Sequence, residues 1–143
     1  MKLKIQRIDK SLPLPEYKTK GAVAFDIYSR TAEVIKPQEI KYLPSNLIIR
    51  VPRGHFLMIA ARSSTHKKGL FMAHGVGVLD QDYCGPEDEI FIPLYNFTDK
   101  KVTIQKGDRI AQGILTPIQK AVWHEVDSIK KKSRGGFGST GTK

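Results

Sequence analysis

The chain has 143 residues, enough for one domain but not for two complete hydrophobic cores. Hydrophobic residues make up 40% of it, and the longest apolar run, residues 56–61, is far shorter than the ~20 residues of a membrane-spanning helix. Lys and Arg (24) outnumber Asp and Glu (14), giving a net charge of +10. This charge favours a polyanionic partner, such as nucleic acid, a nucleotide or an anionic surface, or it belongs to an ordinary basic surface.

The first residues, MKLKIQ, alternate charged and apolar side chains, which excludes a secretory signal at this position. The single cysteine, Cys84, has no partner for an intrachain disulfide and no companion cysteines for a structural zinc site. We therefore predict a cytoplasmic protein in a reducing compartment, with no membrane association.

Short runs rich in Val, Ile, Tyr and Phe, broken by Pro or Gly, predict strands along the chain. After an alternating segment at residues 3–8, the predicted strands are residues 22–29, 39–43, 46–51, 55–60, 89–96, 101–104 and 109–117. One short helical turn is predicted between Arg62 and Lys68. The pattern predicts an all-β protein, a sandwich or a jelly-roll-like distorted β-barrel with at most one short helix.

Residues 61–69, ARSSTHKKG, place hydroxyls and cations at the start of the predicted turn. Free backbone N–H groups beside hydroxyls and cations suit a phosphate group. The same residues are equally typical of a helix N-cap followed by solvated lysines, and in isolation that interpretation is favoured.

Residues 75–85, GVGVLDQDYCG, place Asp80 directly after an apolar run. A carboxylate at the end of a buried strand is positioned to act as a general base, and the glycines allow close approach of the backbone to a ligand. The alternative is a hairpin in which Asp80 and Asp82 are turn residues.

Residues 128–143 have almost nothing to bury, and we predict that they form a mobile, Gly-rich C-terminal arm after a barrel domain of residues 1–127. The basic and glycine residues of this arm match neither a P-loop nor a dinucleotide fingerprint, and they are also typical of a nucleic-acid-binding tail. A flexible tail needs no aromatic residue, so the presence of Phe137 suggests that this side chain has a functional role.

Taken in order, these segments resemble the five short motifs of the trimeric dUTPase family. They read GAVAFDIYS (residues 21–29), ARSS (61–64), GVGVLDQDYCG (75–85), GDRIAQ (107–112) and RGGFGSTG (134–141), and they span nearly the whole chain. The resemblance implies hydrolysis of dUTP to dUMP and pyrophosphate, with Mg²⁺ on the triphosphate. It also implies a homotrimer in which each active site is built from three subunits, and no specific nucleic-acid partner.

The resemblance assigns roles at the phosphates. Asp80 is implied as the carboxylate that orients and deprotonates the water attacking the α-phosphorus. Asp26 is implied to act near the Mg²⁺ ion through water. The implied phosphate-binding residues are Arg62, Ser63, Ser64 and Gln112.

Base and sugar recognition are implied at the hairpin of residues 74–83, where backbone groups around Gly75 and Val78 pair with the uracil edge. Tyr83 is implied to pack under the deoxyribose, where a 2′-hydroxyl would clash. The arm is implied to close over the site, with Phe137 stacking on uracil. Its other contacts are implied for Arg134 (or, as a second choice, Lys132), Gly138, Ser139 and Thr140.

The sequence departs from the family pattern at several positions. Ala61 and Ser64 replace the usual Pro and Gly of the second motif, and His74 stands where some members carry a base-facing Asn. The segment from Cys84 to Glu89 is longer and more acidic than the usual return of the hairpin.

Two alternative functions remain open at this point. One is the related dCTP deaminase family, some of whose members also cleave the triphosphate, for which Glu87 and Glu89 are the only nearby candidates for the deaminating glutamate. The other is a basic β-barrel that binds nucleic acid through residues 130–134, although such a module would need exposed aromatic residues on its strands.

Overall fold

The computed structural model describes residues 1–136 and Gly141. Within this part of the chain all regular structure is β-strand except for one 3-10 turn, η1 (Thr65–Lys68). The strands are β1 (Lys4–Arg7), β2 (Phe25–Tyr28), β3 (Glu33–Ile35), β4 (Ile40–Pro44), β5 (Leu47–Arg50), β6 (His55–Ala60), β7 (Leu70–Met72), β8 (Gly77–Leu79), β9 (Phe91–Asn96), β10 (Val102–Ile104) and β11 (Arg109–Pro117). The predicted fold class, all-β with at most one short helix, is confirmed.

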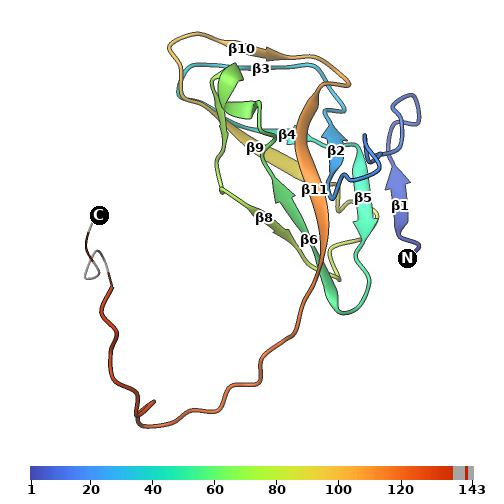
Figure 1. Cartoon of the computed structure of the whole chain (residues 1–143). Coiled ribbons are helices and arrows are strands. Elements are labelled where there is room, and N and C mark those ends of the chain that lie inside the picture. Colours follow the sequence, from blue (N-terminus) through green and yellow to red (C-terminus); the bar gives the residue numbers. More distant parts are fainter. Residues whose placement is uncertain (137–140, 142–143) are drawn as a thin grey trace.

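The strands of the described residues pair antiparallel in small sheets, in the orders β2-β11-β6-β8, β4-β9-β7, β1-β5 and β10-β3. Figure 1 shows the long strand β11 running between β2 and β6 along the front of the barrel. The pairing places Gln112 of β11 opposite Asp26 of β2 on one side and opposite Ala60 of β6 on the other. Three motifs that are far apart in the sequence therefore meet at one row of this sheet.

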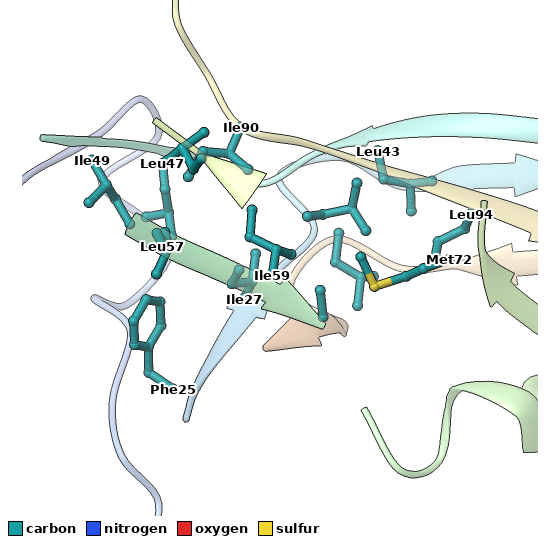
Figure 2. Packing of buried hydrophobic residues seen from close by; sticks show 14 of the residues in the cluster. Phe25, Ile27, Leu43, Leu47, Ile49, Leu57, Ile59, Met72, Ile90 and Leu94 are labelled. Atoms are coloured by element: carbon teal, nitrogen blue, oxygen red, sulfur yellow. The ribbon is translucent and has the colours of Figure 1, made fainter. Parts of the chain in front are cut away.

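Aliphatic side chains from all of these sheets fill a common core (Figure 2). Several of them, including Ile27, Leu43, Leu57 and Ile92, are completely buried. Burial of such a side chain stabilises the fold by about 1.5–3 kcal/mol. Because β2, β6 and β8 each send side chains into this core, the side chains on their outer faces and at their ends are held in fixed relative positions.

Three short strands were not predicted from the sequence: β3, β7 and β8, each of three residues. A three-residue strand is too short to show the alternation of apolar and polar side chains by which longer strands are recognised. β7 pairs with β9 and β8 pairs with β6, so these two strands flank the turn at residues 73–76 without forming a hairpin with each other. The turn and β8 begin the segment of residues 74–83 that was predicted to carry the uracil-binding backbone.

The chain leaves the barrel after β11. Residues 119–136 are exposed and contain no helix or strand, and Figure 1 shows them extending well away from the sheets. Val122 and Trp123 are 94% and 90% exposed. The division of the chain at residue 127 and the mobility of the arm remain predictions. Within the described residues, no helix is long and apolar enough to cross a membrane.

Candidate active site

A buried carboxylate lies between two arginines on the β2-β11-β6 face. Asp26 of β2 is 9% exposed. Arg62 donates from Nε to Oδ1 of Asp26 at 2.8 Å, and Arg109 donates from Nη1 to Oδ2 at 3.1 Å. Burial of an unpaired carboxylate is costly, and these two charge-assisted hydrogen bonds offset that cost. With two guanidinium groups to one carboxylate, the cluster keeps a net positive charge and suits an anionic ligand.

The phosphate-binding residues predicted beside Asp26 lie around this cluster. Gln112 donates from Nε2 to the carbonyl oxygen of Ala61 at 2.9 Å, so the amide is held next to the ARSS segment. Ser64 accepts a hydrogen bond from Nη1 of Arg62 at 3.4 Å, and Ser63 is exposed. The structure therefore brings Asp26, Arg62, Ser64 and Gln112 together on one face.

The alternative interpretation of residues 61–69, a helix N-cap followed by solvated lysines, agrees with the structure in the place of Ser64 and in the exposed lysines. Phosphate binding by this segment stays a prediction. Ser64 occupies the N-cap position of η1 but makes no side-chain capping hydrogen bond, and its hydroxyl contacts Arg62 instead. The last turn is basic, with His66, Lys67 and Lys68 all exposed. The Ser63 hydroxyl and the lysines are therefore accessible to a ligand, whereas Thr65 is buried.

Arg109 was not singled out from the sequence, although it lies in the GDRIAQ motif. In a regular strand, residues 109 and 112 face opposite sides of the sheet, because side chains alternate. The pairing of β11 with β2 shifts register between Arg109 and Ala111. A bulge of this kind re-aims a side chain, and here Arg109 reaches the same carboxylate that lies opposite Gln112.

A second cluster of predicted residues lies in the segment that runs from the turn at residues 73–76 through β8 to Tyr83. Val78, Asp80 and Tyr83 line a pocket of about 300 Å³ together with His74. Asp80 is exposed directly after the buried Leu79, and among the described residues its carboxylate has no hydrogen-bond or ion-pair partner. The carboxylate is thus free to accept a proton or to hold a water molecule.

Gly75, Gly77 and Tyr83 each have a different structural environment in this segment. Gly75 has φ +70° and open space around its Cα, so the turn depends on its conformational freedom. Gly77 is buried, and a Cβ there would lie 3.1 Å from Cβ of Ile59 and 3.2 Å from the His74 ring. Gly77, Ile59 and His74 line the same pocket as Asp80, so a Cβ at Gly77 would crowd that pocket. The close approach of its backbone to a ligand stays a prediction. Tyr83 is 40% exposed, and its hydroxyl donates to the carbonyl oxygen of Glu89 at 3.3 Å.

The predicted site residues form two groups that make no direct polar contact within the described part of one chain. No hydrogen bond or ion pair of the described residues joins the Asp26 cluster to Asp80 or Tyr83. Lys132 and Arg134 are exposed on the extended C-terminal segment (Figure 1). The predicted arm contacts at Phe137, Gly138, Ser139 and Thr140 lie outside the described residues.

Comparison with known proteins identifies the chain. Residues 10–141 match the dUTPase family. A deoxyuridine 5′-triphosphate nucleotidohydrolase of Dictyoglomus turgidum is 38% identical, with 96% of each chain covered. Another from Helicobacter pylori strain J99 is 37% identical, with 99% of this chain and 97% of the relative covered. The chain belongs to the dUTPase family. The predicted family is thereby confirmed, and the nucleic-acid-binding and dCTP deaminase alternatives are set aside.

Solved structures confirm the dUTPase fold. The dUTPase of Staphylococcus bacteriophage 80alpha with dUpNHpp superimposes on this dUTPase with a TM-score of 0.86 over 98% of each chain, at 24% identity. The Streptococcus mutans dUTPase has a TM-score of 0.77 at 28% identity, covering 83% of this chain and 98% of its own. A mutant dUTPase from phage phi11 of S. aureus has a TM-score of 0.82, and in that protein a structural Mg(II) ion is coordinated.

The residues of this dUTPase fit a magnesium ion held mainly by substrate. The described residues contain no group of three or more His, Cys, Asp or Glu side chains able to enclose a metal. Magnesium in nucleotide enzymes usually keeps several waters and binds substrate phosphates rather than a protein cage. Both oxygens of Asp26 accept from arginines, and each has a second lone pair for a water molecule. Asp26 therefore suits contact through water rather than direct ligation.

Proposed function

We propose that this dUTPase hydrolyses dUTP to dUMP and pyrophosphate with Asp80 as the general base. The observation that carries the proposal is the free Asp80 carboxylate at the end of β8, beside a pocket that Tyr83 also lines. Asp80 orients a water molecule and takes its proton as the oxygen attacks the α-phosphorus. General-base catalysis contributes about 10²–10⁴-fold, so positioning and charge neutralisation supply the rest of the acceleration.

The triphosphate binds to the cationic side of the site. Arg62, Ser63, Ser64 and Gln112 contact the phosphates, and Arg134 of the arm adds a further guanidinium. When bound, Mg²⁺ neutralises charge on the triphosphate and orients it for attack, and Asp26 holds one of its waters. The predominantly basic surface raises the local concentration of the anionic substrate. The Asp26–Arg62 pair supports this arrangement, because it holds the arginine in one orientation before substrate arrives.

Backbone groups of residues 74–83, which include the turn before β8, select uracil. Uracil offers a donor at N3 and an acceptor at O4, and cytosine reverses both. Two mispaired buried groups cost about 2–6 kcal/mol, enough to reject dCTP. The methyl group of thymine meets backbone around Gly75 and Val78, and Tyr83 packs under the deoxyribose, where a ribose hydroxyl has no room.

The active sites are shared within a homotrimer. This proposal is supported by the apolar face of the β4-β9-β7 sheet, where Tyr42, Phe71 and Phe91 are 66%, 52% and 44% exposed. An apolar depression of about 680 Å³ adjoins the same face. Large exposed apolar patches usually mark interaction surfaces.

We also place the enzyme in the cytoplasm, where a reducing environment suits the free Cys84.

Substrate selection is tested with a nucleotide panel. We expect rapid pyrophosphate release from dUTP with Mg²⁺, and a kcat/KM for dCTP at least about 30-fold lower, the factor that corresponds to about 2 kcal/mol of mispairing. For dTTP we also expect a lower kcat/KM than for dUTP, because of the methyl group alone. Ammonia release from dCTP is measured in parallel. Comparable turnover of dCTP or dTTP, or release of ammonia, would contradict the proposal.

Shared sites are tested by mixing two inactive variants. Arg62→Gln loses the guanidinium charge yet can still donate to Asp26, and Asp80→Asn loses the proposed base. If each site takes Arg62 and Asp80 from different subunits, equimolar mixing under exchange conditions restores up to about a quarter of wild-type activity, because one site in four receives both native residues. A mixture that stays inactive while mass spectrometry shows mixed trimers would contradict sharing.

A further inference from the structure

A buried acidic residue at the end of the β8–β9 loop has no part in the proposed chemistry. Glu89 is 5% exposed. Arg30 donates to its carboxylate twice, from Nε to Oε1 and from Nη2 to Oε2, each at 2.9 Å. The backbone N–H of Asn46 also donates to Oε1, at 2.8 Å. A bidentate arginine and a third donor leave this carboxylate one orientation, and the pairing with Glu89 raises the pKa of Arg30.

The main chain beside this carboxylate is equally constrained. Ile90 donates from its N–H to the carbonyl oxygen of Leu47 at 3.0 Å, and its own carbonyl accepts from Ser45 at 2.9 Å. Arg30 is itself anchored, because its N–H donates to the carbonyl oxygen of Pro44 at 2.8 Å. The loop therefore ends at a rigid point that is fixed to the barrel on several sides.

Tyr83 is tied to this rigid point. Its hydroxyl donates to the backbone carbonyl of Glu89 at 3.3 Å, and the residue lines the same pocket as Asp80. Among the described residues this is the only hydrogen bond of the Tyr83 hydroxyl. The position of the far end of the ring therefore depends on where the carbonyl of Glu89 is held.

The Asp80 end of the loop has separate anchors. Gln81 donates from Nε2 to the carbonyl oxygen of His55 at 2.9 Å. Within the acidic segment, Asp88 accepts the N–H of Gly85 at 2.6 Å. Neither contact involves Arg30 or the Glu89 side chain, so disturbing the ion pair releases Tyr83 without directly releasing Asp80.

We propose that the Arg30–Glu89 ion pair is a positioning device that sets the preference of the enzyme for dUTP over UTP through Tyr83. The inference rests on the proposed contact of Tyr83 with deoxyribose. With the pair intact, the ring is held where a 2′-hydroxyl has no room. When the pair is lost, the backbone hydrogen bonds of Ile90 remain, but the carbonyl of Glu89 is held less tightly, so the ring can yield and ribose is admitted.

The test measures kcat and KM for dUTP and UTP in the full-length Glu89→Gln variant, which keeps the shape of the side chain and removes its charge. We expect the ratio of kcat/KM for dUTP over UTP to fall about tenfold, the scale of one ordinary hydrogen bond. The change lies in a lower KM for UTP, with kcat for dUTP within about twofold of wild type. Arg30→Lys keeps the positive charge but loses the bidentate geometry. This variant replaces Glu89→Gln in the test if Glu89→Gln fails to fold.

A double-mutant cycle separates positioning from a merely structural role. Tyr83→Phe removes the hydroxyl that contacts Glu89, and we expect Glu89→Gln to cause no further loss of selectivity in that background. Glu33→Gln is the matched control. It breaks the Lys41–Glu33 ion pair, in which Nζ and Oε2 are 2.9 Å apart and neither residue lines the pocket, and we expect it to keep wild-type selectivity. The proposal is overturned if Glu89→Gln lowers the melting temperature but leaves the selectivity for dUTP over UTP unchanged. It is also overturned if the effect of Glu89→Gln on selectivity adds fully to that of Tyr83→Phe.

The outcomes distinguish this proposal from the proposed function. A wild-type enzyme that hydrolyses dUTP and UTP equally well would overturn the role of Tyr83 and with it the positioning role of Glu89, while leaving Asp80 as the base. A wild-type enzyme without activity on dUTP would instead overturn the proposed reaction.

Discussion

Replacing Asp80 by asparagine lowers kcat for dUTP by about two to four orders of magnitude, the range that general-base catalysis contributes. The amide has nearly the same shape as the carboxylate but cannot take a proton from water. Asp80 is exposed and, among the described residues, unpaired, so the substitution leaves stability within about 0.5 kcal/mol of wild type. The measurement is pyrophosphate release at saturating dUTP with Mg²⁺, together with a thermal melt of each protein.

Asp82→Asn is the matched control, because Asp82 is also exposed and lies two residues away but does not line the pocket. It retains wild-type kcat. If both variants lost activity equally, the loop as a whole rather than the Asp80 carboxylate would be required. An Asp80→Asn enzyme with most of its activity would contradict the assignment of the base.

Removing the residues after Lys132 lowers kcat/KM for dUTP by about two to four orders of magnitude and leaves the oligomer intact. The deletion removes the charge-assisted phosphate contact of Arg134 and the stacking of Phe137 on the base. These are worth about 1.5–3 and about 1–3 kcal/mol, together about 2.5–6 kcal/mol. All strands of the described residues lie before residue 118, so the barrel does not depend on the deleted segment. Activity assays and light scattering measure the two quantities.

Deleting only Thr142 and Lys143 is the control for this truncation, and it preserves full activity. The single substitutions Arg134→Ala and Lys132→Ala test which of the two cations contacts phosphate. We expect the larger loss of kcat/KM for dUTP from Arg134→Ala. A fully active enzyme that ends at Lys132 would disprove closure of the arm over the site. Dissociation of the truncated enzyme into monomers would mean that the arm is needed for assembly.

Local sequence patterns were sufficient to predict the positions of most strands of the barrel. Residues 55–60 and 109–117 were predicted as strands with the bounds that β6 and β11 have in the structure. Other predicted strands differ from the observed ones by one to three residues at their ends, as in β2 and β9. Runs of β-branched and aromatic residues ended by Pro or Gly carry this information within the segment itself. The motifs likewise assigned candidate roles to Asp80, Tyr83, Arg62 and Gln112, and these roles stay predictions.

Only the tertiary structure decided which of these side chains contact one another. The partners of Asp26 are 36 and 83 residues away in the chain, and those of Glu89 are 59 and 43 residues away. Arg109 reaches Asp26 because a register shift in β11 changes the direction of its side chain, which no alternation rule predicts. The short strands β7 and β8 form because β9 and β6 provide pairing partners. Contacts of this kind depend on strand register and on packing of the whole core, and neither is encoded in any local stretch of sequence.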